Sequence, residues 1–218
     1  MSYSIVVVGT SWGGLNALRE LVGKLPASFR VPTVLVQHRH RQSDHLLSTF
    51  LQERTQLTVA EVEDKMPIEP GMLFVAPADY HLLIDRGSFA LSTDPPVRYS
   101  RPSIDVTFYS AADAYGAETI GVVLTGANSD GSRGLRRIFD RDGVALVQDP
   151  TTAESPTMPS AAIRCVPDAR VQTIPQIAAT LTELAADASP ERAPRVPRSS
   201  LEPRPDDGPR RTAPPGGA

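Results

Sequence analysis

The chain has 218 residues, a formal net charge of −3 and a single cysteine, Cys165. Residues 188–218 hold six Arg and four acidic residues, which leaves residues 1–187 with a net charge of −5. This acidic body argues against a nucleic-acid binder, which needs a basic surface. One cysteine excludes an internal disulfide and a zinc site built from several thiolates. With no signal sequence and no apolar run of spanning length, we expect a cytoplasmic protein without membrane insertion.

The first 52 residues alternate between strand and helix patterns. Short β-branched apolar runs predict buried strands, and apolar residues spaced three and four apart predict helices. In chain order we expect a strand at 4–9, a helix at 15–24, a strand at 31–37 and a helix at 45–52 that is capped by Ser43 or Asp44.

The middle of the chain, residues 57–94, has a different pattern. Extended pieces at 59–62, 72–76, 81–84 and 89–92 are separated by turn residues. We expect at least one antiparallel hairpin here, turning around Gly87. Alternation of helix and strand then resumes with a helix at 105–115, a strand at 118–124, a helix at 134–142, a strand at 143–148 and a closing helix at 174–186.

Buried strands that alternate with amphipathic helices indicate an α/β fold. We predict a doubly wound, mainly parallel sheet in a Rossmann-like three-layer arrangement, with one antiparallel hairpin, over a domain of residues 1–187. Residues 188–218 contain eight Pro and three Gly and almost nothing apolar, so we predict a disordered tail. A tail without a role is favoured over one that binds a partner weakly.

A glycine-rich turn, GTSWGG, follows the first predicted strand at residues 9–14. As a phosphate cradle of the form G-x-G-x-x-G it has Ser11 at the middle glycine, and no ribose-binding acid follows the second strand. As a nucleophile elbow of the form G-x-S-x-G it fits, with Ser11 in a sharp strand-to-helix turn. Gly9 and Gly13 would flank the serine because a Cβ would clash there. The N–H of Trp12 is then the natural oxyanion donor.

A serine nucleophile needs a base and a group that orients the base. His38 directly follows the strand predicted at 31–37, and Asp130 lies in the polar run after the strand at 118–124. Sites of doubly wound sheets form outside the carboxyl ends of the strands, where Ser11, His38 and Asp130 would meet. Each has a plainer interpretation: His38 as an ordinary loop histidine, and Asp130 as a helix cap or an Asp-Gly turn.

At this point the sequence resembles the CheB-type protein-glutamate methylesterases of chemotaxis. The resemblance covers the catalytic domain, about residues 4–184, in order and spacing. It rests on residues 8–14 (VGTSWGG), 36–38 (VQH), 76–81 (APADYH), 101–106 (RPSIDV), 121–131 (GVVLTGANSDG) and 158–159 (MP).

The resemblance implies a serine hydrolase that demethylates glutamate methyl esters of chemoreceptor-type proteins and deamidates some glutamines, with no metal or cofactor. The family's triad falls on Ser11, His38 and Asp130. Its oxyanion and substrate cleft falls on Trp12, Gly13 and Ala127. The partner implied is a methylated chemoreceptor-like substrate, with a separate regulatory protein as a second candidate.

The chain departs from the family pattern in several places. A receiver domain usually precedes the esterase, whereas here the esterase begins at residue 1, so we expect no phosphorylation control in cis. Trp12 replaces a small or hydroxyl-bearing residue, and Ala127 and Ser129 replace Met and a Gly or Asn. Trp12 either narrows the cleft or stacks on the substrate, or is a surface aromatic without a role. Asp105 is expected to cap the helix that follows it.

Two other functions remain as alternatives. The missing receiver domain and the altered loops favour a regulatory or binding module that keeps the esterase fold without its activity. Nucleotide binding at the turn of residues 9–14 is the third hypothesis, and it ranks lowest.

Overall fold

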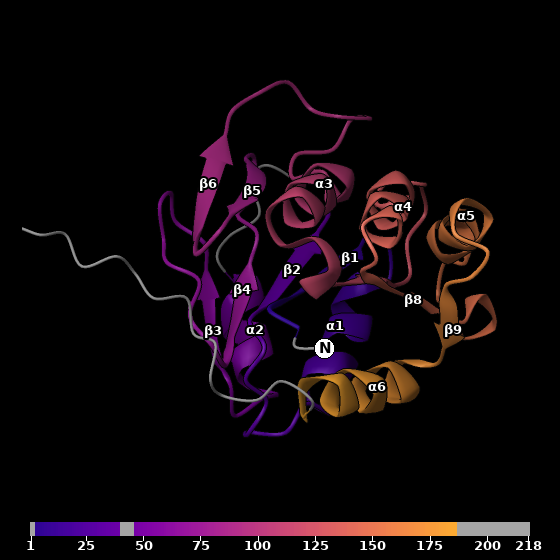
Figure 1. Ribbon diagram of the computed structural model, residues 1–218, viewed down its shortest axis with the longest axis horizontal. Coiled ribbons are helices and arrows are strands. Elements are labelled where there is room, and N and C mark those ends of the chain that lie inside the picture. Colours follow the sequence, from indigo (N-terminus) through magenta and orange to yellow (C-terminus); the bar gives the residue numbers. More distant parts are fainter. Residues whose placement is uncertain (1–2, 40–45, 187–218) are drawn as a thin grey trace, which may run out of the picture.

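The computed structural model describes residues 3–39 and 46–186 (Figure 1). Its centre is a sheet in the order β3-β4-β2-β1-β7-β8-β9, in which every neighbouring pair is parallel. A separate antiparallel pair, β5-β6, turns at Gly87. The strands are β1 Ile5–Thr10, β2 Thr33–Gln37, β3 Thr58–Glu61, β4 Met72–Val75, β5 His81–Asp85, β6 Ser88–Ser92, β7 Thr119–Val123, β8 Val144–Gln148 and β9 Arg170–Gln172.

Helices cover both faces of the sheet and complete three layers (Figure 1). Along β1, Val6 and Val8 face the layer of α1, α2 and α6, while Ile5 and Val7 face α3, α4, α5 and the hairpin. All four side chains are buried, as two covered faces of a parallel sheet require. The helices are α1 Gly14–Val22, α2 Leu46–Gln52, α3 Ile104–Tyr115, α4 Ser132–Asp140, α5 Thr157–Cys165 and α6 Ile174–Ala186, with short 3-10 turns η1 Gly116–Glu118 and η2 Pro150–Thr152.

The predicted fold class is confirmed, and so is the hairpin at Gly87. The pieces expected at 59–62 and 72–76 are β3 and β4, which join the parallel sheet at its edge. Two elements are not predicted by the sequence pattern: α5, which contains Pro159, and β9, which has only three residues. The proposed caps Ser43 and Asp44 and the tail of residues 188–218 lie outside the described residues, so the boundary at residue 187 stays a prediction.

The topology explains why polar groups collect at one edge. β1 pairs with β2 on one side and with β7 on the other. The strands that follow β1 in the chain are therefore added first on the β2 side and then on the β7 side, which makes β1 the switch point of the sheet. Side chains just after the carboxyl ends of these three strands therefore share one crevice, where ligands bind in doubly wound folds. In the described ranges, no helix is long and apolar enough to cross a membrane.

Candidate active site

The turn after β1 is held by the ends of the two neighbouring strands. The Ser11 N–H donates to the Thr125 carbonyl (3.0 Å), and the Thr10 hydroxyl donates to the same oxygen (2.8 Å). On the other side, Gln37 Nε2 donates to the Ser11 carbonyl (2.8 Å). The Ser11 hydroxyl makes no hydrogen bond to any described residue, so the turn fixes the backbone and leaves Oγ free.

Both glycines of the G-x-S-x-G turn are required by the geometry, as the sequence predicted. Gly13 has φ 77°, a left-handed conformation that disfavours other residues. A Cβ on Gly9 would lie 2.2 Å from Cγ2 of Ile104, the first residue of α3, whose side chain is fully buried. The close approach of β1 to α3 therefore depends on a missing side chain.

Gly9→Ala is expected to lower the free energy of unfolding by about 1–3 kcal/mol, the usual cost of forcing a methyl group into a packed core. Chemical denaturation measures this loss. Ile104→Leu removes the clashing Cγ2. Gly9→Ala should therefore cost less stability when it is added to Ile104→Leu than when it is added to the wild type. Equal losses with and without the Ile104 change would contradict a clash at this contact.

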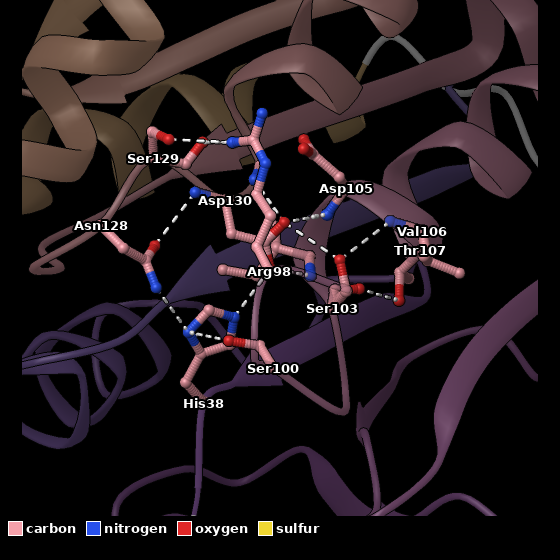
Figure 2. Close-up of polar contacts among 12 residues, drawn as sticks. His38, Arg98, Ser100, Ser103, Asp105, Val106, Thr107, Asn128, Ser129 and Asp130 are labelled. Atoms are coloured by element: carbon pink, nitrogen blue, oxygen red, sulfur yellow. Dashed lines mark hydrogen bonds and ion pairs between the residues drawn. The ribbon is translucent and has the colours of Figure 1, made fainter. Parts of the chain in front are cut away.

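His38 and Asp130 lie side by side, as Figure 2 shows. His38 follows β2, and Asp130 lies in the loop between β7 and α4. The distance from His38 Nε2 to Asp130 Oδ2 is 2.8 Å, and the side chains are 11% and 1% exposed. This contact joins two of the three predicted catalytic residues.

Asp130 is also bound by the N-terminus of α3. Its two carboxylate oxygens accept from the Ser103 hydroxyl (3.0 Å) and from the backbone N–H groups of Ile104 (2.7 Å) and Asp105 (3.0 Å) (Figure 2). Burial by itself would raise the pKa of Asp130, but the hydrogen bond and charge of His38 and these backbone donors outweigh it, so the pKa is lowered. Asp130 is therefore an ionised acceptor for the imidazole.

Asp105 does not cap its own helix, which corrects the sequence-based expectation. The N-cap of α3 is Ser103, whose hydroxyl accepts from the Val106 N–H. The Asp105 carboxylate instead accepts from the Gly134 N–H (2.8 Å), in the first turn of α4. Burial raises the pKa of Asp105, and the nearby charge of Asp130 adds to this effect.

Asp105→Asn is expected to stabilise the protein more at pH 7.5 than at pH 4. Because the pKa of Asp105 is raised on folding, its ionised form costs stability once the pH exceeds the ordinary value of about 3.9. Asparagine keeps an acceptor for the Gly134 N–H without that charge. Urea unfolding of both proteins across this pH range measures the difference, and a difference that shrinks as the pH rises would contradict the argument.

Ser11 and His38 open into one cleft of about 350 Å³. The predicted cleft residues Trp12 and Gly13 line it, and Trp12 is 67% exposed. Ala127 is exposed but is not among the lining residues. The complete lining is Ser11, Trp12, Gly13, Gly14, Leu15, Asn16, Gln37, His38 and Glu154.

Four residues around this site were not singled out from the sequence. Asn128 and Ser100 contact the other ring nitrogen of His38, and Ser103 contacts Asp130. Glu154 brings a carboxylate to the rim of the cleft beside Gly13. Ser103 and Asn128 stand in stretches that carry the family resemblance, which was the available signal. Glu154 has no such signal, because only the fold brings residues 12–14 and 154 together.

The described residues contain no group of three or more His, Cys, Asp or Glu side chains placed to hold a metal ion. The site itself combines a serine hydroxyl that has no hydrogen bond to the described residues with an imidazole bound to a carboxylate. The strand order, together with the position of this site at the carboxyl ends of β1, β2 and β7, defines a doubly wound α/β protein whose site lies at the switch point of the sheet.

Comparison with known proteins narrows the class to a family. Residues 6–181 match the family described as CheB methylesterase. A protein of Leptospira interrogans named as a putative protein-glutamate methylesterase/protein-glutamine glutaminase is 43% identical over 179 residues, which cover 82% of this chain and 93% of that protein. The chain therefore belongs to the CheB methylesterase family.

Two further relatives agree in fold and sequence. A protein-glutamate methylesterase/protein-glutamine glutaminase of Carboxydothermus hydrogenoformans is 41% identical over 73% of this chain and 48% of its own length. The crystal structure of the Thermotoga maritima CheB methylesterase catalytic domain has a TM-score of 0.80 and 33% identity, and the match covers 84% of this chain and all of that one. The chain thus spans nearly the whole Leptospira relative and about half of the Carboxydothermus one.

Proposed function

We propose that this protein is a protein-glutamate methylesterase in which Ser11, His38 and Asp130 form the catalytic triad. One observation carries the proposal: Ser11 and the His38–Asp130 pair lie at the same edge of the sheet, and Ser11 and His38 line one cleft. The chain also belongs to the CheB methylesterase family. The relatives' names support both ester and amide hydrolysis, so glutamine deamidation belongs to the same proposal.

The reaction is acyl transfer through a serine ester. Ser11 Oγ attacks the methyl ester carbonyl of a glutamate side chain while its proton passes to His38. Collapse of the tetrahedral intermediate breaks the bond to methoxide, which takes that proton and leaves as methanol. Water then attacks the acyl-enzyme with His38 again as base, and glutamate is released. Asp130 orients the ring and stabilises its charged form. With glutamine as substrate, ammonia leaves in place of methanol.

The oxyanion would be held by backbone donors beside the serine. The N–H of Trp12 makes no hydrogen bond to any described residue, and neither does that of Ala127. The Trp12 N–H lies just before α1, where a free donor suits a developing negative charge, and the Ala127 N–H follows β7, the strand next to β1. Removing one such donor typically costs about 10²–10³ in rate, so these N–H groups form a substantial part of the proposed mechanism beside the triad side chains.

The substrate proposed is a methylated chemoreceptor-like protein, and the second partner proposed is a separate regulatory protein. Trp12 supplies an exposed aromatic surface next to the reacting serine, which supports substrate contact over a role without function. Trp12 would act either by narrowing the cleft or by stacking on the substrate, and the proposal includes both modes of contact.

The direct test combines turnover with covalent trapping. The purified chain is incubated with a receptor cytoplasmic fragment carrying labelled methyl esters, and volatile methanol is measured. A fluorophosphonate probe is then mapped by peptide mass spectrometry. We expect methanol release and a single modified residue, Ser11. A folded protein that releases no methanol and takes no label would favour the regulatory module instead.

A further inference from the structure

Both ring nitrogens of His38 are engaged, each by a different part of the site. Nε2 lies 2.8 Å from Asp130 Oδ2, and Nδ1 lies 3.2 Å from Asn128 Nδ2 (Figure 2). The Ser100 hydroxyl is a more distant neighbour of Nδ1, at 3.4 Å. Since Ser11 Oγ is bound to neither nitrogen, the question is which nitrogen can take its proton.

The orientation of the Asn128 side-chain amide determines which ring nitrogen of His38 carries hydrogen. Its side-chain oxygen accepts from the Asp130 backbone N–H (3.0 Å), so its amide nitrogen must face His38. An amide nitrogen only donates, and therefore Nδ1 of His38 must accept. At the other side of the ring a carboxylate only accepts, so Nε2 must carry the hydrogen. Two independent partners thus require the same tautomer.

The position of Ser100 agrees with this assignment. Val97 and Ser100 exchange two backbone hydrogen bonds (3.1 and 2.9 Å) across a tight turn whose central residues, Arg98 and Tyr99, have φ 48° and 67°. The turn places the Ser100 hydroxyl beside Nδ1 (Figure 2), where it can donate. A turn that requires two non-glycine residues with positive φ persists only where the surroundings impose it.

We propose that Asn128 is a positioning residue that fixes His38 in the tautomer with hydrogen on Nε2 and so makes Nδ1 the proton-accepting nitrogen. This inference rests on the proposed function and names the reacting atom within it. The usual serine-triad arrangement is reversed here, because there the aspartate binds Nδ1 and Nε2 faces the serine. For the reaction, Nδ1 exchanges its contact with Asn128 for one with Ser11 Oγ.

Asn128 also acts on the protonated intermediate. Once Nδ1 has taken the serine proton, the ring cannot return to its resting contact with Asn128, because two N–H donors would then face and repel each other. The imidazolium is therefore disfavoured on that side and gives its proton to the leaving group more readily. A neutral hydrogen bond contributes only about 0.5–1.5 kcal/mol, so exchanging Asn128 for Ser11 is a small step.

The test compares Asn128→Asp and Asn128→Ala with Ser129→Ala as the matched control. Ser129 belongs to the same loop, but its hydroxyl accepts from Arg98 and does not contact His38. Among the described residues, Asp130 binds the ring, Asp105 and Arg98 lie within electrostatic reach of one another beside Asp130, and Glu154 lines the same cleft as His38. None of the three variants removes these groups.

Nitrogen-15 NMR of the His38 ring, assigned with His38→Gln, reads the tautomer directly. We expect the wild-type protein at neutral pH to carry hydrogen on Nε2 and none on Nδ1. In Asn128→Asp, a carboxylate faces Nδ1 and should protonate it. The acidic limb of the kcat/KM profile should then move to higher pH, with a loss of about tenfold at pH 7. Asn128→Ala should move the limb in the same direction by less, and Ser129→Ala should leave it in place.

Two results would overturn the inference: hydrogen on Nδ1 in the neutral wild-type ring, or an Asn128→Asp profile that superimposes on the wild-type one. A purely structural role of Asn128 would lower activity equally at every pH without moving the limb. If the protein proves to have no esterase activity, the ring spectrum still reports the tautomer, so failure of the proposed function stays distinguishable from failure of this inference.

Discussion

Ser11→Ala should reduce methanol release by about 10⁴–10⁶-fold while leaving the protein as stable as the wild type. The kinetic loss follows because no acyl-enzyme forms without the hydroxyl. Stability should be unchanged because Ser11 Oγ makes no hydrogen bond to the described residues, and the backbone bonds that hold the turn are retained. Such a change is expected to fall within about 0.5 kcal/mol.

Loss of methanol release together with unchanged stability would separate a catalytic role of Ser11 from a structural one. Ser92→Ala, on the hairpin strand β6, is the matched control and should keep full activity and full labelling by the fluorophosphonate. An Ser11→Ala protein that is folded yet still releases methanol at an undiminished rate would remove Ser11 from the mechanism. A large drop in its melting temperature would show instead that the hydroxyl has a structural partner.

The sequence predicted the parts of this site that local patterns determine. Ser11 and His38 each follow a buried apolar run, and the carboxyl ends of parallel strands lie at one edge of the sheet. The same rule predicts Asp130 after β7, and in the structure its carboxylate contacts His38. Its catalytic role, like that of the other two residues, stays a prediction that the variants test.

The parts that the sequence did not predict depend on contacts between distant segments. Asp105 was expected at the cap of α3, because acidic residues favour that position, yet its carboxylate reaches α4. Ser103 is the cap because its backbone is extended (φ −100°, ψ 132°), whereas Asp105 already lies in the first turn of α3. The approach of Glu154 to Gly13 and of Asn128 to His38 needs the packed fold, since no local pattern encodes either.

Asp130→Asn should lower kcat by about 10⁴-fold, as expected when the triad carboxylate becomes an amide. An amide nitrogen in place of Oδ2 would donate to His38 Nε2 and shift the ring hydrogen to Nδ1, so the base would be lost. The same nitrogen would face the Ile104 N–H, now 2.7 Å from Oδ2, as a second donor. That conflict should cost about 2–4 kcal/mol of stability. Asp140→Asn, at an exposed ion pair with Arg136, is the control and should leave kcat unchanged.

The stability loss of Asp130→Asn should depend on pH in a defined direction. Because the pKa of Asp130 is lowered on folding, its ionised form stabilises the protein fully above the ordinary value of about 3.9. That contribution disappears as the pH falls through the lowered folded value, where the carboxyl is protonated in both states. The gap between wild type and variant should therefore be widest near neutrality and close at acid pH, as measured by urea unfolding from pH 7 to pH 2.5. A gap that widens on acidification would mean that the carboxyl is bound in its neutral form, and would leave His38 without an anionic partner.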